Sequence, residues 1–84
     1  KIKYIKDTSM LYDNTKCAEC DYSEKEIKIA KSSNDTTYSD KWLEETLYHE
    51  LAHAFMYETG NDDLNDERHA ELLTHFAMFI KNNL

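Results

Sequence analysis

The sequence of 84 residues contains no proline and a single glycine, Gly60. These two residue types usually mark turns and helix ends, so the sequence offers few direct signs of where elements stop. The boundaries must therefore be read from the spacing of apolar residues and from residues that cap helices. A chain of this length has room for one domain, 1–84, with a thin hydrophobic core.

The sequence also lacks long apolar runs and an excess of basic residues. No stretch approaches the roughly 20 apolar residues that span a bilayer, and the opening KIKYIKDT lacks the apolar core of a secretion signal. Lys and Arg total 10 against 17 Asp and Glu, for a net charge of −7, which repels nucleic-acid phosphates and anionic membranes. We therefore expect a cytoplasmic protein that binds neither nucleic acid nor membranes.

Cysteine is scarce as well, with one CAEC pair formed by Cys17 and Cys20. Such a pair supplies half of a four-cysteine zinc site, but no second pair completes it. The redox form of the pair opens a helix within a βαβ unit, which the surrounding pattern does not predict. We expect two reduced cysteines in or beside a strand, with a second metal site or a disulfide as the alternatives.

Alternating apolar residues predict short strands in the first third of the chain. The segments 1–6 (KIKYIK) and 26–31 (EIKIAK) have apolar residues at every second position, which is typical of half-buried strands. A third short strand is expected over 18–22, joined by a turn to the strand that follows. The polar stretch 31–40 has the composition of a loop.

Helical spacing of apolar residues begins at Asp40, after Ser39, and ends at Gly60, a residue found just beyond helix ends. After the turn NDDLND, Asn65 or Asp66 should cap a second helix that runs to about Lys81. The residues predicted to face the core are Leu43, Leu47, Leu51, Ala54 and Phe55 in the first helix, and Ala70, Leu73, Phe76, Ala77 and Ile80 in the second. The fold class is α+β, a small curled sheet followed by two helices.

The first helix carries the motif HELAH, in which His49 and His53 lie four residues apart and Glu50 follows the first histidine. On a helix that advances about 100° per residue, the two histidines lie about 40° apart and one turn from each other. A catalytic zinc takes three protein ligands and leaves a fourth position to water. The motif thus supplies two ligands, with Glu50 near enough to act as general base. The alternative is three polar residues on an ordinary amphipathic helix.

A third ligand must come from elsewhere, and the second helix offers Glu67, Glu71 and His75, spaced four residues apart on one side. Glu67 lies nearest to the apolar edge of that helix, so we expect it to point toward the first helix. Glu71 is the alternative ligand, and each acid could instead be a surface residue that supports the helix start or pairs with a cation. His69 is expected to pack at the helix interface.

The segments HELAHAFMYETG and NDERHAELLTHF together resemble the ImmA/IrrE-like metallopeptidases, especially the very small forms found in phages and other mobile elements of bacteria. The resemblance covers residues 39–80 and includes a glutamate with a small residue three positions later, after a short acidic turn. These enzymes are gluzincins, whose zinc is held by two histidines and a glutamate. The resemblance therefore implies a minimal zincin-like fold with Zn²⁺ bound by His49, His53 and Glu67, and with Glu50 as the base.

The resemblance further implies a zinc metallopeptidase in a bacterial or phage-infected cell, with a regulator or repressor as its protein substrate. Glu50 would activate a zinc-bound water for hydrolysis of the peptide bond. We expect the substrate to lie along an edge strand at 26–31, and Tyr57, Tyr38 or His75 to stabilise the oxyanion. The alternatives are a zinc-binding interaction module without catalysis and a metal-free interaction protein. Because the chain begins at a lysine, we expect a trimmed or partial product.

Overall fold

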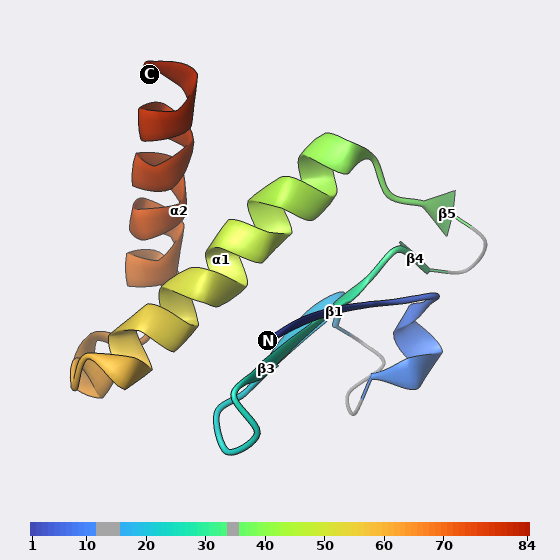
Figure 1. Ribbon diagram of the computed structural model, residues 1–84, viewed down its shortest axis with the longest axis horizontal. Coiled ribbons are helices and arrows are strands. Elements are labelled where there is room, and N and C mark those ends of the chain that lie inside the picture. Colours follow the sequence, from blue (N-terminus) through green and yellow to red (C-terminus); the bar gives the residue numbers. More distant parts are fainter. Residues whose placement is uncertain (12–15, 34–35) are drawn as a thin grey trace.

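The computed structural model describes residues 1–11, 16–33 and 36–84. In chain order its elements are β1 (Ile2–Ile5), the 3-10 turn η1 (Thr8–Met10), β2 (Ala18–Asp21), β3 (Glu26–Ala30), β4 (Ser32–Ser33), β5 (Thr36–Thr37), helix α1 (Asp40–Glu58), the 3-10 turn η2 (Asp62–Leu64) and helix α2 (Glu67–Asn82). A curled sheet followed by two helices confirms the predicted α+β class (Figure 1). The three predicted strands begin and end within one residue of β1, β2 and β3.

The strand β3 is the central strand of a three-stranded sheet in the order β1-β3-β2. It pairs in parallel with β1 and antiparallel with β2. Its side chains Ile27 and Ile29 are buried, as alternate positions of a strand are when one face is covered. The prediction that 26–31 forms an edge strand is therefore wrong, because both edges of β3 are already paired.

The stretch 31–40 contains a second, two-stranded sheet that the sequence pattern did not predict; residues 34–35 of this stretch lie outside the described part. The strands β4 and β5 pair antiparallel, with Ser32 opposite Thr37. The Ser32 hydroxyl also donates to the backbone oxygen of Lys6 at 2.8 Å. Because these strands consist only of serine and threonine, they lack the apolar alternation by which strands are recognised.

Both helices begin at the side-chain caps that the sequence suggests. The Ser39 hydroxyl accepts a hydrogen bond from the Trp42 amide at 3.1 Å, and the Asp66 carboxylate accepts one from the His69 amide at 2.8 Å. Beyond the end of α1, Gly60 has a φ of +78°, a conformation that glycine adopts without steric cost. Neither helix of the described segments has an apolar stretch of the length that a membrane span needs.

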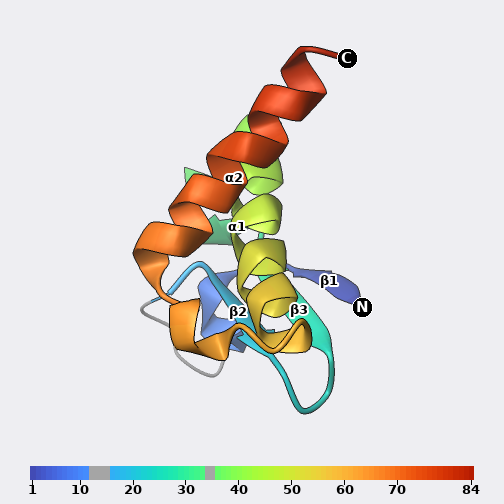
Figure 2. The same ribbon diagram turned by 90° about the vertical axis from the view of Figure 1, so that its left-hand side faces the viewer.

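The helix α1 lies between the sheet and α2, so it has two buried sides (Figures 1 and 2). The side toward the sheet packs Leu43, Leu47 and Ala54 on Ala18, Ile27 and Ile29. The side toward α2 packs Ala52 and Met56 against Ala70, with Leu73 at the margin. A separate small cluster of Ile5, Leu11 and Ala30 fills the far end of the sheet.

The predicted apolar faces of the two helices are only partly buried. Phe55 and Phe76 were expected in the core, but they are 56% and 59% exposed. Ala52 and Met56, which were not predicted, are buried in their place because α1 must also cover α2. One helix that contacts two neighbours divides its buried surface into two stripes, and a single periodic stripe in the sequence does not reveal this division.

Candidate metal centre

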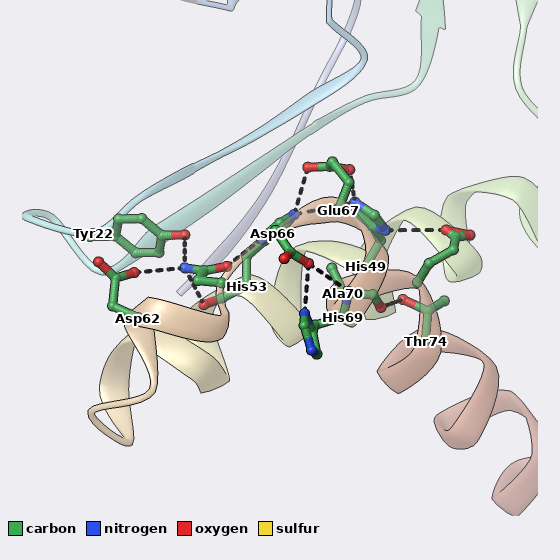
Figure 3. A network of polar contacts seen from close by, with 11 residues as sticks. Tyr22, His49, His53, Asp62, Asp66, Glu67, His69, Ala70 and Thr74 are labelled. Carbon is green, nitrogen blue, oxygen red and sulfur yellow. Dashed lines mark hydrogen bonds and ion pairs between the residues drawn. The ribbon is translucent and has the colours of Figure 1, made fainter.

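The HELAH segment lies in the middle of α1, and Glu67 is the first residue of α2. The Nε2 atoms of His49 and His53 are 3.3 Å apart. The Glu67 carboxylate bridges them, with Oε2 at 2.9 Å from His49 Nε2 and Oε1 at 3.0 Å from His53 Nε2 (Figure 3). Ligand atoms of the three residues all lie within 4.8 Å of one another, which is close enough for one metal ion.

The spacing of these atoms fits a tetrahedral zinc ion. Ligand atoms about 2.0–2.1 Å from such an ion lie about 3.3–3.4 Å from each other, since a tetrahedral edge is about 1.6 times the bond length. The distance of 3.3 Å between the Nε2 atoms of His49 and His53 falls in this range. The contacts to Glu67 are slightly shorter, as direct hydrogen bonds between these groups are. Two imidazoles and a carboxylate are also a donor set that suits zinc.

Glu50 is half-buried and lines a cleft of about 650 Å³ together with His49, His53 and Glu67. Burial raises the pKa of the Glu50 carboxyl above its usual value. His53 and His49 act in the opposite direction, and the charge of Glu67 adds to the rise. A carboxyl with a raised pKa accepts a proton more readily, as a general base must.

The other wall of this cleft is formed by β2 and the residues next to it, including Tyr22. The Ala30 amide donates to the Cys17 carbonyl at 2.9 Å. Along an antiparallel strand, residues whose backbone groups bond the neighbouring strand alternate with residues whose backbone groups point away from it. The backbone groups of Ala18 and Cys20 therefore point away from β3, toward the open edge of β2. The edge that faces the cleft thus belongs to β2.

A comparison with protein families gives a match to the SprT-like family over residues 3–82. The chain belongs to the SprT-like family. SprT-like domains are zinc metallopeptidase-like domains, the class that HELAH and the clustered ligands independently indicate. The match supports this class and not the ImmA/IrrE-like family in particular, so the narrower resemblance stays a prediction. No curated protein and no solved structure matches the chain.

The remaining candidates on α2 of this SprT-like chain lie outside the three-residue cluster. A carboxylate oxygen of Glu71 is 3.7 Å from His49 Nδ1, the ring nitrogen opposite to the one that contacts Glu67. His75 is exposed and its Nε2 is 3.9 Å from the Glu71 carboxylate. The ring of His69 contacts Asp66, the cap of its own helix, at 2.8 Å, and its side chain is 42% exposed; its packing at the helix interface stays a prediction.

The three predicted oxyanion donors lie in different places in this SprT-like chain. Tyr57 stacks on Tyr22 with ring centroids 4.3 Å apart, and Tyr38 stacks on Trp42 at 3.9 Å. His75 lines a second cleft, of about 510 Å³, which lies between α1 and α2. The two clefts meet at Trp42, Thr46 and His49. His75 thus shares a cleft with a candidate metal ligand.

The sequence predicts Asn65 only as a possible helix cap, but its side chain contacts a candidate metal ligand. Its Oδ1 atom lies 2.6 Å from Nδ1 of His53, while Asp66 caps α2. The Asn65 amide nitrogen donates to the Tyr22 hydroxyl at 2.9 Å and to the Asp62 carboxylate at 3.0 Å. No spacing rule links an asparagine in a turn to a histidine twelve positions earlier, so the sequence carried no signal for this contact.

Both cysteines of the SprT-like chain are free and partly buried. Cys17 directly precedes β2 and Cys20 lies within it, as predicted, and no disulfide joins them. Burial, and after it the charge of Glu50, raises the pKa of the Cys20 thiol to about 11. That thiol is therefore protonated at neutral pH and is poorly suited to bind a metal ion.

Proposed function

We propose that this SprT-like domain is a zinc-dependent peptidase that hydrolyses a peptide bond of a specific protein substrate. The observation that carries the proposal is the meeting of His49, His53 and Glu67 at one point, with Glu50 in the same cleft. Zinc is proposed as the metal because of this donor set, two imidazoles and one carboxylate with a position left for water.

The chain supplies the proton transfers of the proposed reaction. Zinc, when bound, lowers the pKa of water and polarises a peptide carbonyl. The Glu50 carboxylate takes a proton from the attacking water and then gives it to the nitrogen of the leaving amine. The partial burial of Glu50 favours both steps, because it brings the pKa of the carboxyl closer to neutral pH.

We further propose that the substrate lies in an extended form along the open edge of β2. The outward backbone groups of Ala18 and Cys20 can hydrogen-bond a peptide strand, and the same cleft contains Glu50. The net charge of −7 favours docking of a partner without a strong negative charge. A regulatory protein such as a repressor is the proposed substrate, on the strength of the resemblance of residues 39–80 to the ImmA/IrrE-like enzymes.

The first test is the metal content of protein purified without added metal. We expect about one zinc per chain in the wild type and in Glu50→Gln, and a loss of zinc in His53→Ala and Glu67→Ala. Zinc retained in Glu67→Ala but lost in Glu71→Ala would assign the third ligand to Glu71 instead. A wild type that binds no zinc, even after zinc is added back, would contradict the proposed site.

The second test asks whether the metal centre cleaves peptide bonds. A mixture of cellular proteins is incubated with wild type or with Glu50→Gln, and new amino termini are identified by mass spectrometry. We expect a small set of new termini with wild type that is absent with Glu50→Gln, since that variant keeps the zinc ligands and lacks the base. Identical sets from the two proteins, with zinc bound to both, would exclude peptidase activity on these substrates.

An interaction module held together by zinc is a second candidate function. The residues Leu72, Phe76 and Phe79 lie on one side of α2 and are 66%, 59% and 64% exposed. Large exposed apolar residues gathered on one face are typical of surfaces that bind other proteins. This function does not need a base, so Glu50→Gln would retain it while the peptidase would be inactive.

A further inference from the structure

The side chain of Asn65 contacts three different parts of the molecule. Its Oδ1 atom is 2.6 Å from Nδ1 of His53 on α1. Its Nδ2 atom is 2.9 Å from the Tyr22 hydroxyl, 3.0 Å from the Asp62 carboxylate and 3.4 Å from the backbone oxygen of His53. Figure 3 shows Tyr22 and Asp62 close to His53.

The partners of Asn65 determine which way its amide points. The Asp62 carboxylate and the His53 carbonyl can only accept hydrogen bonds, so they must face Nδ2. Oδ1 then faces Nδ1 of His53, and because Oδ1 is an acceptor, this contact is a hydrogen bond when Nδ1 carries the hydrogen. A neutral imidazole with its hydrogen on Nδ1 has its lone pair on Nε2, the form that a metal ion on Nε2 requires. In the absence of metal, the Glu67 carboxylate at 3.0 Å from Nε2 is a second acceptor that competes for the same hydrogen.

The Tyr22 side chain gives Asn65 a fixed partner. Its ring stacks on Tyr57 of α1, with centroids 4.3 Å apart and planes inclined by 14°. Asn65 is partly buried and therefore sits between α1, the turn η2 and the residue that follows β2. Contacts on several sides leave its amide little freedom to turn away from His53.

We propose that Asn65 is a positioning residue for the metal centre, which holds His53 in the tautomer and orientation that direct Nε2 at the metal. This inference rests on the proposed metal site and does not depend on peptidase activity. Outer contacts of this kind typically change metal affinity 10- to 100-fold when they are removed. His49 has a weaker counterpart, since Glu71 lies 3.7 Å from its Nδ1, beyond hydrogen-bond distance.

The test compares zinc affinity, by competition with a chromophoric chelator, among the metal-free wild type and three variants. Asn65→Leu removes the acceptor, Asn65→Asp keeps an oxygen acceptor at the same place, and Asn61→Leu is the matched control. Asn65→Asp is made in an Asp62→Asn background, so that an amide rather than a second carboxylate faces the new carboxylate. Asn61 belongs to the same turn, but its side-chain amide bonds Thr59. We expect zinc binding to weaken 10- to 100-fold in Asn65→Leu, to recover most of that loss in Asn65→Asp, and to change less than about threefold in Asn61→Leu.

A second readout follows the tautomer directly. Long-range ¹H–¹⁵N NMR of metal-free Glu67→Ala, in which the carboxylate that faces Nε2 is removed, reports which ring nitrogen of His53 carries the hydrogen at a pH of about 8, where a typical histidine is neutral. We expect Nδ1–H in Glu67→Ala and a shift toward Nε2–H when Asn65→Leu is added. This measurement separates a positioning role from a general loss of stability, which would leave the tautomer of the folded protein unchanged.

Three outcomes would overturn the inference: unchanged zinc affinity in Asn65→Leu, an equal loss in Asn61→Leu, or an Nε2–H tautomer of His53 in Glu67→Ala. If the wild type binds no zinc, the metal proposal fails, and the His53 tautomer in Glu67→Ala, with and without Asn65→Leu, still decides whether Asn65 positions the ring. If Asn65→Leu does not fold, as judged by circular dichroism, the tautomer in Glu67→Ala and the zinc affinity of Asn65→Asp decide the inference.

Discussion

Helix α1 contacts the sheet on one side and α2 on another, and different interactions stabilise the two contacts. On the sheet side, three apolar side chains of the helix cover Ala18 and two buried isoleucines of β3. On the α2 side, the apolar contact is small, centred on Ala52, Met56 and Ala70, and the polar cluster of the metal centre lies next to it. We infer that hydrophobic burial secures the sheet, whereas α2 depends to a larger degree on its polar contacts and on bound metal.

Among the changes that test this difference, Ile29→Ala should cause the largest loss of unfolding free energy. The Ile29 side chain is fully buried between the sheet and α1, and truncation of such a residue costs about 2–5 kcal/mol of unfolding free energy. Urea unfolding followed by circular dichroism measures the loss. A loss below about 1 kcal/mol would mean that the sheet side is not the stable half.

Removal of zinc should have the second-largest effect on stability, and it should destabilise the α2 side of α1 more than the sheet side. If zinc is present at about 100 times its dissociation constant, its removal lowers the free energy of unfolding by about 2.7 kcal/mol. Hydrogen exchange with and without a chelator should show the greatest loss of protection in α2, with β3 less affected. Equal loss in both elements would show that the two sides of α1 unfold together.

Ala70→Leu should weaken the packing of α2 on α1 without removing a candidate metal ligand. Ala70 is fully buried where the helices meet, and insertion of a larger side chain into such a place costs about 1–3 kcal/mol. Because Glu67 lies one turn earlier on α2, we also expect zinc to bind more weakly. Calorimetric titration with zinc checks this, and a variant with unchanged zinc affinity would show that Glu67 is positioned by the turn alone.

Phe76→Ser should have the smallest effect. Phe76 is on the exposed side of α2, and surface substitutions usually change the free energy of unfolding by less than about 0.5 kcal/mol. Urea unfolding of dilute protein provides the value. A loss above about 1 kcal/mol would indicate that the outer face of α2 is covered in solution.

Elements supported by local signals were predicted well. Side-chain caps at Ser39 and Asp66 and the single glycine at Gly60 mark helix ends through contacts within a few residues. The four-residue spacing of His49 and His53 likewise fixes their relation on one helix. The position of Glu67 around α2 predicts that it points toward α1, and the structure brings it against both histidines.

Features that depend on distant contacts could not be predicted. The central place of β3 results from a parallel pairing with β1, which skips over β2 in the chain and leaves no local pattern. The exposure of Phe55 follows from the division of α1 between two neighbours. The contact of Asn65 with His53 depends on the path of the turn between the helices. In each case the missing information was the arrangement of elements in space.

The three candidate ligands and Asn65 beside them lie within the short segment 49–67. The entropy lost on closing a loop grows with the logarithm of its length, and contacts between near neighbours in sequence form faster than distant ones. The sheet, by contrast, needs Ile2 to pair with Ile27 from a separate part of the chain. We therefore expect the helical hairpin to assemble early in refolding, so that the ligands gather before the parallel strands have found each other.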